Sequence, residues 1–224
     1  MKIIEFTGVA GAGKSTICDL LEKELGDQGY RVLNLHVLGA EENLFEKVHR
    51  KYIWKRVKYS RINRNFKHIV QRLELSSEID LDEWIQIIEV MNYRLHKEAG
   101  KYDYVLMDEG IIQAITALYH RMTIDNRRAI RTLLKTICKE YRDSTLIMNM
   151  NIDLNTVCDR LKNRNRADDD FLCDDEKNMK ALLQQKKGNV DFVLGVSGFP
   201  IEQINANQSL DKVLADIMKL FLGK

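Results

Sequence analysis

The chain has 224 residues, of which 45% are hydrophobic, and a formal net charge of +2 at pH 7. This length and composition suit one α/β domain spanning 1–224, and the small net charge excludes a general affinity for nucleic acid or membranes. No apolar run approaches membrane-spanning length. Because the first residues lead directly into a strand pattern, we expect a cytoplasmic protein without a signal peptide.

A phosphate-binding loop is predicted near the start of the chain. An apolar run ends at Gly8, and Gly8, Gly13, Lys14 and Ser15 fill the pattern G-x-x-x-x-G-K-[ST]. The glycines let successive backbone N–H groups point at a phosphate, and the helix that begins at Lys14 adds its positive dipole end. Lys14 would reach the β- and γ-phosphates, and the Ser15 hydroxyl would bind Mg²⁺. The residues expected to contact the nucleotide are Gly8, Ala10, Gly11, Ala12, Gly13, Lys14, Ser15 and Thr16.

The next elements give a second strand and then a long helical region. The first helix should end near 26–29, and the alternation over 31–37 predicts a strand parallel to the first. Residues 41–100 read as a helical insertion. Its part at 46–72 is basic with interleaved aromatics, which fits a solvated helical face, a wall of cations around an anionic acceptor, or a patch for nucleic acid. An apolar stripe over 81–95 is predicted to be core.

A short buried strand at 102–107 precedes the candidate acids Asp108 and Glu109. Ligands of parallel sheets collect beyond the carboxyl ends of the strands, so this pair should meet the phosphate-binding loop. Asp108 would hold Mg²⁺ directly or through water, and Glu109 would serve as general base toward an acceptor hydroxyl or as a second metal contact. The alternative is a turn that simply closes the strand.

The second half of the chain continues the alternation of helices and strands. A helical pattern over 130–141 and a strand at 145–150 lead to Asp153, a predicted N-cap. A helix over 171 to about 193, a strand over 200–206 and a terminal helix follow. In that last helix the expected apolar face is formed by Leu210, Val213, Leu214, Ile217 and Phe221.

An arginine-rich lid is predicted at 160–172. Arg160 and Arg164 stand four apart and share a helix face, and Arg166 extends the set into a stretch with no apolar residue larger than alanine. Guanidinium groups suit the charge that spreads over a transferred phosphoryl group. A solvated basic helix end is the competing interpretation.

Cysteine and histidine give no sign of metal binding. No C-x-x-C pair occurs, and the five histidines are scattered. Reduced thiols in a cytoplasmic protein are therefore expected for Cys18, Cys138, Cys158 and Cys173.

Taken in order, the P-loop, Asp108-Glu109, the Arg160–Arg164 helix and the final strand running into 205–209 resemble the P-loop nucleoside and nucleotide kinases, and thymidylate kinase in particular. The resemblance implies a three-layer αβα fold with five parallel strands in the order 2-3-1-4-5, and ATP and Mg²⁺ as ligands. It also implies that Lys14, Asp108, Arg160 and Arg164 carry catalysis, and that Asn207 and Gln208 border adenine.

Two departures bear on the acceptor. Thymidylate kinases have Asp-Arg where this chain has Asp108-Glu109, and the loop after the second strand lacks the usual Glu-Pro. The leading hypothesis is phosphoryl transfer from ATP to a nucleoside or nucleoside monophosphate. The alternatives are a kinase for another metabolite or a polynucleotide end, and a nucleotide-dependent switch that uses 46–72 for a nucleic-acid or protein partner. A homodimer is compatible with the sequence.

Overall fold

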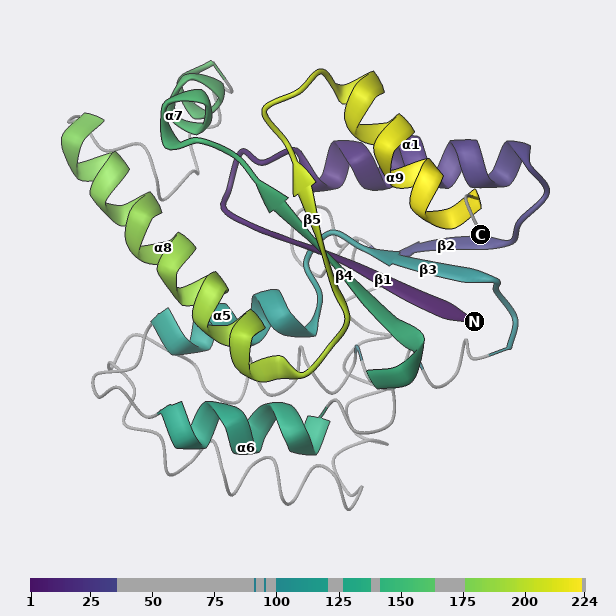
Figure 1. Cartoon of the computed structure of the whole chain (residues 1–224), viewed down its shortest axis with the longest axis horizontal. Helices are drawn as coiled ribbons and strands as arrows, with labels where there is room; N and C mark the ends of the chain where they lie inside the picture. The colour runs from purple at the N-terminus through teal and green to yellow at the C-terminus, as the bar shows by residue number, and fades with distance from the viewer. Residues whose placement is uncertain are drawn as a thin grey trace, which may run out of the picture.

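The fold is described from a computed structural model, for residues 1–35, 91, 95, 100–120, 127–137, 142–163 and 176–222. At its centre is a five-stranded parallel sheet of order β2-β3-β1-β4-β5 (Figure 1). The strands are β1 (Lys2–Thr7), β2 (Val32–Leu35), β3 (Tyr104–Met107), β4 (Thr145–Asn151) and β5 (Ile201–Asn205). The predicted fold class and strand order are therefore confirmed.

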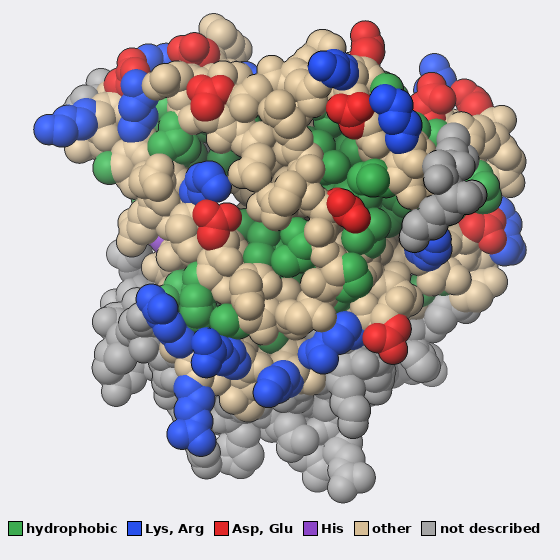
Figure 2. Space-filling model, in the orientation of Figure 1, with side chains coloured by type: hydrophobic (Ala, Val, Ile, Leu, Met, Phe, Trp, Pro, Cys, Tyr) green, Lys and Arg blue, Asp and Glu red, His purple; other side chains and the backbone are tan. Residues whose placement is uncertain are grey.

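Helices cover both faces of this sheet, as Figure 1 shows. One face carries α1 (Lys14–Asp27) and α9 (Leu210–Leu222), and the other carries α5 (Ile111–His120) and α8 (Glu176–Ser197), with α6 (Arg127–Ile137) beyond them. The short α7 (Leu154–Lys162) stands past the end of β4, and the 3₁₀ turn η1 (Arg142–Ser144) leads into that strand. In Figure 2 lysine and arginine side chains gather where α6 exposes Arg127, Arg128, Arg131 and Lys135.

Two apolar clusters, one on each face, hold these layers together. Side chains alternate across a strand, so Ile3 joins the cluster formed with α5, α6 and the second half of α8, whereas Ile4 and Phe6 join the one formed with α1, α7, α9 and the first half of α8. Met91 and Leu95 are buried in the first cluster, as the predicted core stripe requires of them. Within the described residues, no helix is long and apolar enough to cross a membrane.

Most predicted elements have their counterparts, with two corrections near the C-terminus. The predicted end of a helix near Val193 is wrong, since α8 continues to Ser197 and is followed by Gly198 with a left-handed φ of 72°. The expected inward position of Leu210 is also wrong, because this side chain is 40% exposed beside the P-loop. Cys18 and Cys158 are buried thiols outside any disulfide.

Several predictions lie outside the described residues. One is the helical insertion at 41–100, of which only residues 91, 95 and 100 are described, so its basic stretch 46–72 lies outside. The others concern the lid residues Arg164 and Arg166 and the cysteines Cys138 and Cys173.

Candidate active site

The P-loop (Gly8–Ser15) joins the end of β1 to the start of α1. Gly8 has a φ of 136°, and a Cβ there would lie 2.9 Å from the carbonyl oxygen of Met150, so this position needs glycine. Gly13 caps α1 in the left-handed conformation and offers no side-chain oxygen. The first backbone N–H groups of α1 therefore face the loop without a side-chain cap, which is the arrangement that binds phosphate.

Lys14 folds back over this loop. Its Nζ donates to the carbonyl oxygens of Gly8 and Val9, each at 3.1 Å, and the side chain is 8% exposed. Ser15 is half-buried beside it, and Thr16 is exposed. The lysine charge is thus held at the mouth of the P-loop, where a bound polyphosphate would lie.

The acidic pair, Asp108 and Glu109, follows β3, which is the neighbour of β1 in the sheet. Asp108 is buried, and Glu109 reaches the solvent. Desolvation by the surrounding protein atoms raises the pKa of Glu109. The positive charge of Lys14 opposes this rise, and the negative charge of Asp108 adds to it. Lys14 and Asp108 both also act on the pKa of the Cys18 thiol in α1, which burial raises above its usual range. The acidic pair and the P-loop lysine are therefore close enough for the charge of Lys14 to act on the pKa of Glu109.

These residues fit a magnesium ion. Mg²⁺ prefers oxygen ligands and binds nucleotides through one or two protein oxygens, with water and phosphate supplying the rest. A buried carboxylate at the end of β3 and the Ser15 hydroxyl at the start of α1 are oxygen donors of that kind. In the part of the chain that the structure describes, no group of three or more His, Cys, Asp or Glu could hold a metal by itself.

Arg160 comes from α7 and lies across the P-loop. Asp153 caps this helix as predicted, accepting from the backbone N–H of Thr156 at 2.8 Å. The Arg160 guanidinium donates to the carbonyl oxygens of Gly11 at 3.4 Å and Ala206 at 3.2 Å. One helix thus presents a cation to both the P-loop and the loop after β5.

The loop after β5 is held by side-chain amides. Asn207 Oδ1 accepts from the backbone N–H of Asp153 at 3.0 Å, and Asn205 Oδ1 accepts from that of Asn207 at 3.1 Å. Gln208 donates to the carbonyl oxygen of Asn205 and to Asp216. Both residues that the resemblance assigns to adenine therefore also tie this loop to its surroundings.

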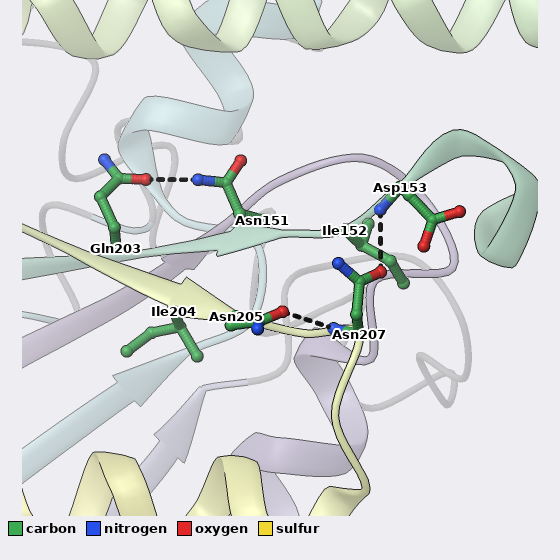
Figure 3. A pocket seen from close by; sticks show the side chains of 7 residues that line it. All are labelled: Asn151, Ile152, Asp153, Gln203, Ile204, Asn205 and Asn207. Carbon is green, nitrogen blue, oxygen red and sulfur yellow. Dashed lines mark hydrogen bonds between the residues drawn. The ribbon is translucent and has the colours of Figure 1, made fainter.

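Beside this loop is a cavity of about 360 Å³, shown in Figure 3. In that view the side chain of Asn207 turns toward Asp153, and the side chains of Asn151 and Gln203 point toward each other. Ile204 lies on the side of β5 opposite to Gln203. The cavity lies at the ends of β4 and β5, whereas the acidic pair follows β3 on the other side of β1. It is therefore separate from the place where the predicted chemistry would occur.

Two residues near the site were missed by sequence reasoning. Leu210, the first residue of α9, lies next to Gly13 together with Arg160, and its position in a helical apolar pattern gave the wrong expectation of burial. Glu5 lies in the middle of β1 and is 1% exposed. A glutamate inside an otherwise apolar strand pattern was the available signal.

Comparison with solved structures finds this fold among nucleoside kinases. Deoxyadenosine kinase from M. mycoides with bound dCTP is 16% identical, with a TM-score of 0.56 over 99% of this chain and 100% of that one. The same enzyme with the products dCMP and a flexible dCDP bound is 18% identical, with a TM-score of 0.54 over 99% of this chain and 100% of that one. The YorR protein of Bacillus subtilis, in complex with phosphorylated GDP, is 15% identical, with a TM-score of 0.53 over 98% of this chain and 95% of that one. At these identities the likeness establishes the fold.

A family comparison gives a second, local match. The model of the adenylylsulphate kinase family matches residues 1–79, which include the P-loop. No curated protein matches the chain. The structure thus has a P-loop kinase fold. The predicted resemblance to the nucleoside and nucleotide kinases is confirmed at the level of the fold.

Proposed function

We propose that this protein transfers the γ-phosphoryl group of ATP to a nucleoside or nucleoside monophosphate. The observation that carries the proposal is that the P-loop follows β1 and the acidic pair follows β3, two neighbouring parallel strands, so that the charge of Lys14 acts on Glu109. A loop that only bound phosphate would not need an acidic pair beside its lysine. A kinase uses such acids to hold a metal ion and to orient the attacking oxygen of the acceptor.

Each of the site residues Lys14, Ser15, Asp108 and Glu109 has a part in the proposed transfer. The N–H groups at the start of α1 and the Lys14 ammonium bind the phosphates of the nucleotide. Asp108 and Ser15 would hold Mg²⁺, which supplies neutralising charge to those phosphates. Glu109 has a raised pKa, which brings a carboxylate nearer to the range in which it accepts a proton efficiently from an acceptor hydroxyl.

Arg160 and the loop after β5 form the proposed border of the nucleotide base. In this role the guanidinium, already shared between Gly11 and Ala206, lies beside the nucleotide. Asn207 and Gln208 would then contact adenine from the loop, as the resemblance implies. Arg164 would join Arg160 in a lid, and residues 46–72 would supply cations to the acceptor.

The comparisons widen the set of acceptors worth testing. Deoxyadenosine follows from the name of the M. mycoides enzyme, and adenylylsulphate follows from the name of the family that matches residues 1–79. Thymidylate follows from the sequence resemblance alone. Deoxyadenosine and adenylylsulphate can offer a sugar hydroxyl to the transferred phosphoryl group, whereas a nucleoside monophosphate such as thymidylate becomes a diphosphate by attack of an oxygen of its own phosphate. The acceptor panel therefore also distinguishes which kind of oxygen the site places beside the acidic pair.

The proposal is tested by Mg²⁺-dependent ADP release from ATP in the presence of single acceptors. The panel holds nucleosides, nucleoside monophosphates, adenylylsulphate, sugars and short oligonucleotides, with Lys14→Ala as the blank. Stimulation by a nucleoside or its monophosphate is the expected result. ATP binding without stimulation by any acceptor would contradict the proposal and favour a nucleotide-dependent switch.

A further inference from the structure

Glu5 is a carboxylic acid in the centre of the sheet, and the mechanism above does not use it. It sits in β1 between Ile4 and Phe6, which are fully buried. Acidic side chains are almost never buried to this degree unless they have partners. The partners of Glu5 lie at the N-terminus of α5, the helix that follows the acidic pair.

The beginning of α5 needs a hydrogen-bond acceptor from elsewhere in the fold. Its first helical hydrogen bond runs from Ala114 N–H to the Gly110 carbonyl oxygen, so the N–H groups before Ala114 have no acceptor within the helix. Gly110, Ile111 and Ile112 are buried, which keeps water away. Glu5 fills this need: Gln113 N–H donates to its Oε1 at 3.0 Å, and the N–H groups of Gly110, Ile111 and Ile112 also act on the carboxyl group.

Gly110 is matched to this carboxyl group by size. Its φ lies outside the left-handed range, so the backbone there does not require glycine. A Cβ at this position would overlap Cδ of Glu5 and lie 2.7 Å from its Cγ. Glycine at 110 therefore makes room for Glu5.

Glu5 also adjoins the other end of the same short connection. In the sheet it is paired with Met107, the last residue of β3. Asp108, Glu109 and Gly110 are all that separate Met107 from Ile111, the first residue of α5. Both ends of the segment that carries the acidic pair are thus fixed by one residue of β1, and β1 itself runs on into Gly8 of the P-loop.

We propose that Glu5 is a positioning residue that caps α5 and so holds Asp108 and Glu109 at a fixed place relative to the P-loop. The inference rests on the proposed function, because it assigns Asp108 to the metal of a nucleotide complex. Loss of the cap should affect nucleotide binding that depends on Mg²⁺, since this depends on where Asp108 lies. It should leave phosphate binding by the P-loop alone nearly intact.

The test measures ATP binding by calorimetry, once with MgCl₂ and once with EDTA, in three variants. Glu5→Met keeps the length of the side chain and removes its oxygens, Glu5→Gln keeps an oxygen acceptor, and Thr116→Val changes a buried polar residue of α5 away from its N-terminus. We expect Glu5→Met to weaken ATP binding about tenfold with MgCl₂ and less than about threefold with EDTA. Glu5→Gln and Thr116→Val should resemble wild type in both conditions. Equal losses in both conditions, or none, would overturn the proposal.

A second pair of variants approaches the same contact from α5 and serves if Glu5→Met does not fold. Gly110→Ala should reduce the Mg²⁺-dependent gain in affinity, because its methyl group displaces the carboxyl group of Glu5. Glu5→Asp, which withdraws the carboxyl group by one methylene, should restore part of this gain when combined with Gly110→Ala. If the two changes acted independently, the contact would not be the one that positions the acids.

The outcomes separate this inference from the proposed function. If wild type binds ATP with Mg²⁺ but phosphorylates no acceptor, the kinase assignment is wrong, and the calorimetric comparison still decides the role of Glu5. If acceptors are phosphorylated and Glu5→Met binds ATP like wild type in both conditions, the role of Glu5 is wrong and the kinase assignment stands. If wild type does not bind ATP in either condition, both are wrong.

Discussion

The P-loop and the acidic pair follow two neighbouring strands of the sheet but are held in place differently. The P-loop takes its shape from a few consecutive residues, with glycine conformations at Gly8 and Gly13 and a lysine that bonds to carbonyl groups of its own loop. The segment with Asp108 and Glu109 depends on Glu5, which lies 108 positions from its hydrogen-bond donor Gln113. A local sequence pattern can therefore reveal how the first region is held, whereas the contact that holds the second becomes evident only when the strands are assembled.

The largest effect should come from removing the P-loop charge. We expect Lys14→Met to lower acceptor-stimulated ADP release by about a thousandfold, because a preorganised cation at the transferred group is lost. The circular dichroism spectrum should stay that of wild type. Lys23→Met, an exposed change on the same helix α1, is the matched control and should keep full activity. Residual activity above a tenth of wild type in Lys14→Met would contradict the assigned role.

The second effect is a pH dependence of stability that originates at Glu5. Burial raises the pKa of this carboxyl group from 4.5 to about 8, although the backbone hydrogen bonds from α5 oppose the rise. Between these two values the folded protein holds a proton that the unfolded chain has lost. The contribution of Glu5 to stability is therefore full below pH 4.5 and falls as the pH rises toward about 8.

Urea denaturation of wild type and Glu5→Gln across this range measures the effect. The free energy of unfolding of wild type should decrease relative to the variant by at most about 1.4 kcal/mol per pH unit, which corresponds to one proton. The amide cannot ionise, so its curve should lack this component. Parallel curves for the two proteins would mean that Glu5 titrates alike in the folded and unfolded chains.

The third effect concerns the turn that starts the P-loop. Gly8→Ala places a Cβ 2.9 Å from the Met150 carbonyl oxygen at a φ of 136°, so it should destabilise the fold by about 2 kcal/mol. Gly26→Ala is the matched control, because a Cβ there meets no atom within 4 Å and the site is helical. Alanine at 26 should leave stability unchanged or raise it by up to about 1 kcal/mol. Equal stabilities of the two variants in urea would show that Gly8 is not constrained.

How far the sequence predicts this molecule depends on whether the signal is local. The P-loop and the Asp153 cap follow from contiguous patterns, whereas the strand order is implied by the resemblance to P-loop kinases; the structure confirms the cap and the strand order. Leu210 shows the limit of periodicity, since it continues the apolar stripe of α9 but lies exposed beside Gly13. The partners of Glu5 could not be derived from its neighbours, because they are amide groups of a helix that begins more than a hundred residues later. The roles of Asn207 and Gln208 toward adenine remain predictions.

The smallest effect should come from the Asp153 cap of α7, the helix that carries Arg160. Asp153→Ala removes the acceptor of the Thr156 N–H and hydroxyl groups and should lower the Tm by about 2–4 °C. Hydrogen bonds from Thr156 lower the pKa of Asp153, so the cap stabilises the fold above the ordinary carboxyl pKa and is lost as the pH falls through the lowered value. The Tm difference between wild type and variant should therefore disappear in acid. Asp159→Ala, an exposed change on the same helix, should show neither the neutral-pH loss nor its disappearance; the same loss in both variants would indicate a general effect of removing charge from α7.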